Sequence, residues 1–208
     1  MSTPLRIVFM GTPAFAVRIL AELQQSQHQV VGVVTVADKP AGRGQQLNQS
    51  AVKQYALANN LPLLQPEKLR NEDFIADLTN LNADLFVVVA FRMLPDVVWK
   101  LPRLGTFNLH ASLLPAYRGA APINWALING DTYTGVSTFL INEHIDAGSI
   151  LLQEQIEIGP NMTFGELHDE LQELGAQLTL QTCNGLADSK IIPKVQKPIS
   201  GKRALAPK

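Results

Sequence analysis

The pattern of apolar and polar residues in the first half of the chain predicts buried strands that alternate with amphipathic helices. Near-continuous apolar runs, which are typical of central parallel strands, cover residues 5–10, 30–36 and 84–91, and a short strand is expected over 61–64. Helices are expected over residues 14–25, 50–59, 66–81 and 96–100. This alternation of strands and helices indicates an α/β fold.

The second half of the chain has a different pattern. Residues 133–141 and 150–158 alternate between apolar and polar side chains, which predicts two strands that pair with each other. Helices are expected over 122–129 and over 163–187, and the second of these is amphipathic. Cys183 fits the apolar face of that helix and is expected in the core.

The stretch 107–119 begins as a strand and continues as a polar loop with proline and glycine. Asn108 and His110 are two residues apart, so in a strand their side chains point to the same face, while Phe107 and Leu109 point to the other. Two polar groups on one face beside a loop are typical of the floor of a functional site. The alternative is a half-exposed strand with two solvated side chains.

Residues 37–50 form a second polar segment, too rich in proline, glycine and polar residues for regular structure. A connection of this length is usually functional or disordered, and it carries Lys39 and Arg43. The alternative is a loop with two solvated cations. Arg92 follows a buried strand and is therefore expected at the ligand-binding edge of the sheet.

Composition and charge narrow the class of protein. The 208 residues are 46% hydrophobic and 17% charged, which is ordinary for a soluble globular protein, and no apolar run is long enough to span a bilayer. A single cysteine and an N-terminus without an apolar signal core favour the cytoplasm. Residues 190–208 hold six basic residues and no acid, whereas the preceding 189 carry a net charge of −7. Such a tail indicates contact with a polyanion or a linker; a solvated tail is the alternative.

Several common chemistries have no signature in this sequence. Gly11 stands alone where a dinucleotide fingerprint needs three glycines, and neither a P-loop nor a nucleophile elbow is present. The lone cysteine and the histidines have no metal-ligand spacing, so no metal is expected; His28 and His168 are expected at the surface and His144 in a solvated loop. What remains is Asn108, His110 and a carboxylate, for which Asp146 is the best candidate. An amide, an imidazole and an acid suit acyl transfer without a covalent enzyme intermediate.

Ordered motifs across nearly the whole chain resemble the folate-dependent formyltransferase family. They are Asn-Leu-His-Ala-Ser-Leu-Leu-Pro at 108–115, Arg-Gly-Ala-Ala-Pro-Ile at 118–123, Asn-Gly-Asp at 129–131, Thr-Gly-Val at 134–136 and Asp-Ala-Gly at 146–148. Phe-Met-Gly-Thr-Pro at 9–13 and Asp-Lys-Pro-Ala-Gly-Arg-Gly at 38–44 are similar to the branch that acts on methionyl-tRNA. The resemblance implies a Rossmann-like, mostly parallel sheet with helices on both faces, the formyltransferase fold.

The resemblance also implies an activity and a role for each site residue. The formyl group of 10-formyltetrahydrofolate would pass to the α-amine of methionyl initiator tRNA through a tetrahedral intermediate. Asn108 and His110 would hold its oxyanion, and Asp146 would position His110 and assist proton transfer. The implied folate-binding residues are Arg92, Met93, Leu94, Ser112, Leu113, Leu114 and Pro115. Lys39 and Arg43 would approach the tRNA acceptor end.

The same resemblance sets expectations for domain organisation. Residues 1–189 are expected to be the catalytic domain and residues 190–208 a basic interdomain linker, with the family's C-terminal β-barrel domain outside this chain. A cytoplasmic monomer with no membrane contact is expected. Two other functions remain open: a formyltransferase for an amino sugar or other small amine, which would not need Lys39 and Arg43, and a folate- or tRNA-binding module without efficient turnover.

Overall fold

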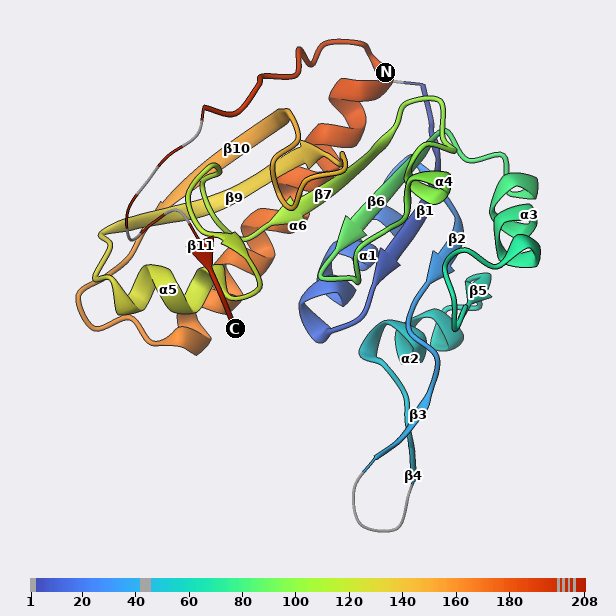
Figure 1. Ribbon diagram of the computed structural model, residues 1–208, viewed down its shortest axis with the longest axis horizontal. Coiled ribbons are helices and arrows are strands. Elements are labelled where there is room, and N and C mark those ends of the chain that lie inside the picture. The colour runs from blue at the N-terminus through green and yellow to red at the C-terminus, as the bar shows by residue number, and fades with distance from the viewer. Residues whose placement is uncertain (1–2, 42–45, 198, 200, 202, 204) are drawn as a thin grey trace. The chain divides into compact units, whose positions relative to one another are not determined.

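The computed structural model describes residues 3–41, 46–197, 199, 201, 203 and 205–208 (Figure 1). The chain divides into two compact units. We call Pro4–Thr106 the N-terminal unit and Phe107–Lys208 the C-terminal unit.

The N-terminal unit is built on a parallel sheet. Its strands are β1 (Arg6–Gly11), β2 (Gln29–Val34), β5 (Leu63–Leu64) and β6 (Leu85–Val89), in the order β6-β1-β2-β5. Every residue of β6 is buried, as is every residue of β1 after Arg6. A strand buried on both sides needs apolar residues at every position, which is why these strands read as continuous apolar runs. The predicted parallel strands are confirmed.

Helices cover both faces of this sheet. They are α1 (Ala14–Gln24), α2 (Ala51–Ala58), α3 (Glu72–Asn80) and α4 (Asp96–Trp99). A Cβ added at Gly11 would lie 2.8 Å from the Cβ of Ala16, so α1 packs on the Gly11 face. A Cβ added at Gly32 would lie 2.6 Å from Leu81, the C-cap of α3, and would also approach Val8. Since Val8 and Gly11 point to opposite faces of β1, α1 and the end of α3 lie on opposite sides of the sheet.

Two predictions about the helices and strands of this unit are wrong. The helix expected over 66–81 begins only at Glu72, where Asn71 caps it by accepting a hydrogen bond from the Phe74 N–H at 3.0 Å. The carbonyls of Pro66 and Glu67 accept hydrogen bonds from Arg92, so they are not used within a helix. The segment 37–50 was expected to be irregular, but β3 (Lys39–Ala41) and β4 (Gln46–Asn48) pair antiparallel (Figure 1). Backbone pairing between two polar segments needs no apolar alternation.

His28 also differs from its prediction. It is buried rather than at the surface, and its Nδ1 accepts a hydrogen bond from the Leu5 N–H at 3.1 Å. The imidazole therefore satisfies a backbone donor just before β1, a partner that is distant in sequence.

The C-terminal unit holds an antiparallel sheet. Its elements are β7 (Thr106–His110), which begins at the boundary of the units, β8 (Arg118–Gly119), α5 (Pro122–Ile128), β9 (Tyr133–Leu140), β10 (Ile150–Glu157), α6 (Phe164–Ala187) and β11 (Leu205–Ala206). Strand β9 lies between β7 and β10 and pairs antiparallel with both. The predicted pairing of the two alternating strands is confirmed. Among the described residues, no helix combines the length and the apolar character that a bilayer crossing requires.

Helix α6 covers one face of this sheet. A Cβ at Gly175 of α6 would lie 2.8 Å from Leu109 Cδ2, and the hydroxyls of Thr138 and Thr182 lie 2.8 Å apart. Cys183 is fully buried in the same interface, as predicted, and burial raises the pKa of its thiol. Because Leu109 faces α6, its neighbours Asn108 and His110 face the opposite side.

The described part of the C-terminal tail packs on the C-terminal unit. Strand β11 pairs parallel with β8, and Ile150 and Lys194 exchange two backbone hydrogen bonds of 2.8 Å. The boundary between the compact units falls between Thr106 and Phe107. The tail, residues 190–208, belongs to the C-terminal unit. The division into a domain over 1–189 and a linker over 190–208 stays a prediction from resemblance.

We predict that Gly135→Ala destabilises the protein. A Cβ at Gly135 would lie 2.1 Å from the Glu154 carbonyl oxygen on β10, so the paired strands must separate. Overpacking of this kind costs about 1–3 kcal/mol of unfolding free energy, measured by urea denaturation. The matched control is Gly165→Ala near the start of α6, where no atom lies within 4 Å. The control should be neutral or stabilising by up to about 1 kcal/mol, and equal losses in both variants would contradict the prediction.

Candidate functional site

Asn108 and His110 share the face of β7 that α6 leaves uncovered. Asn108 is half-buried and His110 is 6% exposed. Phe107 and Leu109 are buried on the opposite face, where Leu109 packs against α6. The predicted placement of the two polar side chains on one face is therefore confirmed. Within the described part of the chain, the Asn108 amide makes no hydrogen bond to another protein group, which leaves it available to a ligand.

The ring of His110 is oriented by a backbone carbonyl. Its Nε2 lies 2.8 Å from the carbonyl oxygen of Tyr117. A carbonyl oxygen can only accept a hydrogen bond, so this contact assigns the Nε2–H tautomer to the neutral ring. The second nitrogen, Nδ1, lies 3.9 Å from Oδ2 of Asp146. That distance is too long for a direct hydrogen bond, which leaves Nδ1 as the ring nitrogen that can exchange a proton with a substrate or a water.

Asp146 comes from the loop between β9 and β10 and has a constrained geometry. Its backbone φ is +48°, a left-handed conformation that costs energy in a residue other than glycine. Its Oδ2 accepts a hydrogen bond of 2.8 Å from the Gly119 N–H of β8. The fold thus brings Asp146 and His110, which are 36 positions apart, to one place. Strain of this kind is concentrated at functional sites.

Ser112 and Leu114 belong to a turn that is held from inside the protein. The fully buried Ser112 donates its hydroxyl to the Ala116 carbonyl at 2.6 Å. Ser137 on β9 donates to the Ser112 carbonyl at 2.6 Å and accepts from the Leu114 N–H at 3.0 Å, and Gln153 donates to the Leu114 carbonyl at 2.9 Å. The Ser112 hydroxyl is therefore used within the turn and the Leu114 side chain is buried, whereas Leu113 and Pro115 are only half-buried.

Arg92, Met93 and Leu94 follow β6 in the N-terminal unit. The Arg92 guanidinium donates to the carbonyls of Glu67, at 2.9 Å, and Pro66, and burial lowers the pKa of Arg92. Leu94 is buried, but Met93 is 68% exposed. The Arg92 side chain therefore braces the 66–67 segment, and the backbone of this stretch and the Met93 side chain are the parts left for a ligand.

Lys39 lies at the start of the β3–β4 pair, and Arg43 falls outside the described residues. The structure describes the base of this hairpin. Lys53 on α2 donates to Asp38 at 2.5 Å and Gln65 donates to the same carboxylate at 3.0 Å. The hydrogen bond from Lys53, followed by that from Gln65, lowers the pKa of Asp38. The hairpin is thus attached to the unit through an ionised carboxylate.

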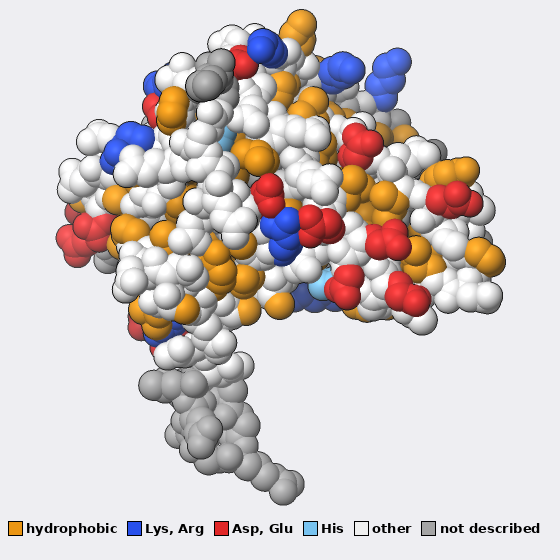
Figure 2. All heavy atoms as spheres, turned by 180° about the vertical axis from the view of Figure 1, so that it is seen from behind, with side chains coloured by type: hydrophobic (Ala, Val, Ile, Leu, Met, Phe, Trp, Pro, Cys, Tyr) orange, Lys and Arg blue, Asp and Glu red, His pale blue; other side chains and the backbone are white. Residues whose placement is uncertain are grey.

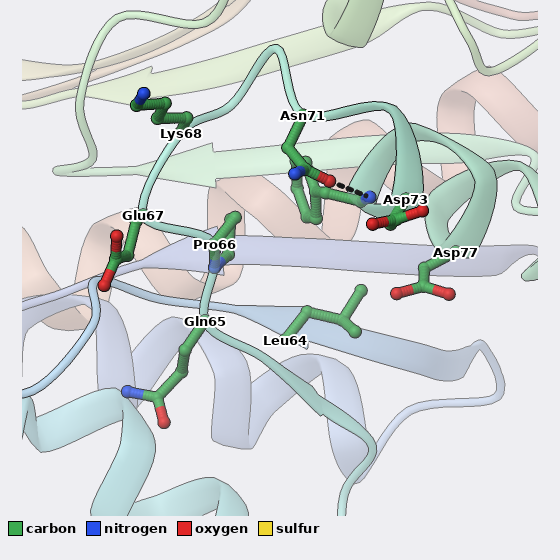
Figure 3. Close-up of a pocket in the computed structure, with 9 residues that line it drawn as sticks. Leu64, Gln65, Pro66, Glu67, Lys68, Asn71, Asp73 and Asp77 are labelled. Atoms are coloured by element: carbon green, nitrogen blue, oxygen red, sulfur yellow. Dashed lines mark hydrogen bonds between the residues drawn. The ribbon is translucent and has the colours of Figure 1, made fainter.

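A pocket of about 540 Å³ lies between β5 and α3 in the N-terminal unit (Figure 3). It is lined by Leu64, Gln65, Pro66, Glu67, Lys68, Asn71, Asp73, Phe74 and Asp77. None of the predicted site residues lines it, and its carboxylates outnumber its single lysine. An anionic ligand therefore does not suit it. Among the described residues, no group of three or more His, Cys, Asp or Glu side chains is placed to hold a metal.

Sequence reasoning missed three groups that position the site: the Tyr117 carbonyl, the Gly119 N–H and the side chain of Gln196. The first two are backbone groups, which have no sequence signal of their own. Gln196 donates to the carbonyls of Asp146, at 2.9 Å, and Gly148, at 2.7 Å. It lies in the tail, whose sequence signal is its basic charge.

Known proteins match most of this chain. The family model described as formyl transferase matches residues 5–183. Methionyl-tRNA formyltransferase from Flavobacterium johnsoniae is 58% identical over 193 residues, which cover 93% of this chain and 61% of that protein. The chain thus spans about three fifths of the length of this relative.

Solved structures share the fold. Glycinamide ribonucleotide transformylase 1 from Symbiobacterium toebii aligns with a TM-score of 0.75 and 16% identity over 93% of this chain and 95% of that one. An N-formyltransferase from Helicobacter canadensis, in complex with folinic acid and dTDP-3-aminofucose, aligns with a TM-score of 0.67 and 21% identity over 94% and 69%. These likenesses confirm the predicted α/β fold class. With the family model matching most of its length, the chain belongs to the formyl transferase family.

Proposed function

We propose that this chain transfers the formyl group of 10-formyltetrahydrofolate to the α-amine of methionyl initiator tRNA. Membership of the formyl transferase family and 58% identity to a methionyl-tRNA formyltransferase support the proposal. The structural observation that carries it is the orientation of His110, with Nε2 held by Tyr117 and Nδ1 turned to Asp146, beside the available amide of Asn108. This set suits direct acyl transfer between two amines.

In the proposed mechanism the α-amine attacks the formyl carbon, and a new C–N bond forms as the carbonyl electrons move to oxygen. The Asn108 amide donates a hydrogen bond to this oxyanion. His110 Nδ1 takes a proton from the attacking nitrogen and, as an imidazolium, also donates to the oxyanion. Collapse of the intermediate breaks the bond to the folate nitrogen, which receives that proton. Asp146 stabilises the transient imidazolium across 3.9 Å.

For the donor, we infer from the family resemblance that Arg92, Met93 and Leu94 of the N-terminal unit, and Leu113 and Pro115 of the C-terminal unit, are folate-binding residues. The family uses formyl-folate donors, and the Helicobacter canadensis structure contains folinic acid. Since the side chains of Ser112 and Leu114 are turned into the protein and their backbone groups are hydrogen-bonded to Ser137 and Gln153, these two residues contribute in this proposal by holding the turn that presents Leu113 and Pro115.

For the acceptor, we infer that Lys39 and Arg43 contact the tRNA. A polyanion needs a cationic surface, and the face formed by α6 is unsuitable: acidic side chains gather over it (Figure 2). The exposed carboxylates of α6 are Glu166, Asp169, Glu170 and Glu173. A cytoplasmic location and a monomeric state stay predictions from the sequence.

We predict that His110→Ala abolishes transfer and leaves the fold intact. Loss of a general base and of an oxyanion donor lowers kcat/KM by about 10²- to 10⁴-fold, measured as formylmethionine formed on tRNA. Asn108→Ala should lose less, because it removes one hydrogen bond to the oxyanion and no proton transfer. The control is His168→Ala on α6, on the covered side of the sheet, which should keep normal turnover. Near-normal activity of His110→Ala would remove His110 from the mechanism.

We also predict that Lys39→Ala with Arg43→Ala raises the KM for tRNA and does not change folate binding. Loss of two phosphate contacts should reduce the slope of log affinity against log salt by about 2. The matched control removes two other cations of the same unit, Lys68→Ala with Lys100→Ala. Equal effects in both double variants would point to net charge rather than to the hairpin. Unchanged tRNA use in the Lys39 and Arg43 variant would remove these two cations from the mechanism. A wild-type protein that forms no formylmethionyl-tRNA but formylates a dTDP-amino sugar would favour the small-amine alternative instead.

A further inference from the structure

Gln196 is a buried polar residue in a largely exposed tail. It is 7% exposed, whereas its neighbour Val195 is 85% exposed. Its backbone is placed by the two hydrogen bonds between Lys194 and Ile150 at the start of β10. A polar side chain is buried in this way only when its hydrogen bonds are made, so the partners of Gln196 show what it does.

The amide of Gln196 is fully used. Its Nε2 donates to the carbonyl of Asp146 at 2.9 Å and to that of Gly148 at 2.7 Å. Its Oε1 accepts from Nη2 of Arg118 at 2.7 Å and from Nε at 3.2 Å. A primary amide has two N–H donors and two acceptor lone pairs, and all four are engaged here. The contact therefore ties β8 to the loop that carries Asp146.

That loop needs an external support. Asp146 has a left-handed φ of +48°. At Gly148 a Cβ would lie 1.6 Å from the Leu140 carbonyl oxygen, so the loop returns tightly against the end of β9. A strained backbone persists only where its surroundings over-determine it. The two hydrogen bonds from Gln196 hold the carbonyls on either side of Ala147 and so fix the backbone on which the Asp146 carboxylate is mounted.

The same tail also holds the partner of His110. The Tyr117 N–H donates to the Arg203 carbonyl at 2.6 Å, while the Tyr117 carbonyl accepts from His110. The Arg203 guanidinium pairs with Asp131 at 2.6 Å, and Asp131 accepts from the Tyr117 hydroxyl at 2.8 Å. Tyr117 is thus fixed at its backbone and at its ring. One tail segment therefore supplies Arg203, which holds Tyr117 beside His110, and Gln196, which holds the Asp146 loop. Both contact the chain at or just before β8, at Tyr117 and Arg118.

We propose that Gln196 is a positioning residue for formyl transfer, which acts by holding the Asp146 backbone so that its carboxylate faces His110 Nδ1. The tail is then part of the catalytic unit and not only a connection. The proposal rests on the proposed function in so far as formyl transfer is the activity measured.

The test compares Gln196→Glu and Gln196→Met with Gln155→Met, an exposed glutamine on β10. Glutamate keeps the pair with Arg118 but has no donors for the carbonyls of Asp146 and Gly148, and methionine loses both sets of contacts. In each Gln196 variant kcat should fall by about 10- to 100-fold through misplacement of Asp146, with little change in the KM for folate or tRNA. The control should retain wild-type kinetics.

A double-mutant cycle separates positioning from a merely structural role. If Gln196 acts through Asp146, adding Gln196→Met to Asp146→Asn costs little further activity, because the carboxylate that it positions is already gone. The proposal would be overturned if the fold-losses in kcat of the two single variants multiplied in the double variant. It would also be overturned if the loss in kcat of Gln196→Glu were explained entirely by a lower melting temperature.

One readout does not depend on turnover. Long-range ¹H–¹⁵N NMR correlations of the His110 ring should change in Gln196→Met and not in Gln155→Met. If the wild-type protein forms no formylmethionyl-tRNA, the proposed function fails, and the ring signals still decide the role of Gln196. Unchanged His110 signals in Gln196→Met would refute that role whatever the substrate.

Discussion

The hydrogen bond from His110 Nε2 to the Tyr117 carbonyl is the interaction on which the candidate site depends. It fixes the tautomer of the neutral ring and turns Nδ1 toward Asp146. The rest of the C-terminal unit supports this one orientation. Strand β7 presents the His110 ring on the face that α6 leaves uncovered. Strand β8 follows Tyr117 directly, and its Gly119 N–H donates a hydrogen bond to the Asp146 carboxylate. The short segment from Tyr117 to Gly119 therefore supports both His110 and Asp146.

Backbone groups, more than side chains, position the catalytic residues of this site. Carbonyls and N–H groups of Tyr117, Gly119 and Asp146 set the geometry, and buried side chains such as Gln196 and Ser137 satisfy the turns that present them. Backbone donors and acceptors cannot change rotamer, so they hold a reacting group more precisely than a mobile side chain does. The strained φ at Asp146 is compatible with this arrangement because the loop is held from several directions.

The errors in the sequence predictions share one cause. Apolar periodicity found the strands and most helices, because burial imposes a period on the side chains. It missed the β3–β4 pair and the true start of α3, where polar backbone interactions decide the structure. The Arg92 guanidinium, which takes the Pro66 and Glu67 carbonyls, comes from a position about 25 residues later. His28 was placed at the surface for the same reason, since its partner is a distant backbone N–H.

By itself the sequence determined the α/β class and the common face of Asn108 and His110. Its ordered motifs also indicated membership of the formyl transferase family. Only the tertiary structure decided which nitrogen of His110 is free, how far it lies from Asp146, and that the tail holds both of their supports. The physical reason is that periodicity and motif spacing report burial and residue type. Hydrogen bonds between segments 27 to 86 positions apart leave no periodic trace, and the fold alone brings their atoms within reach.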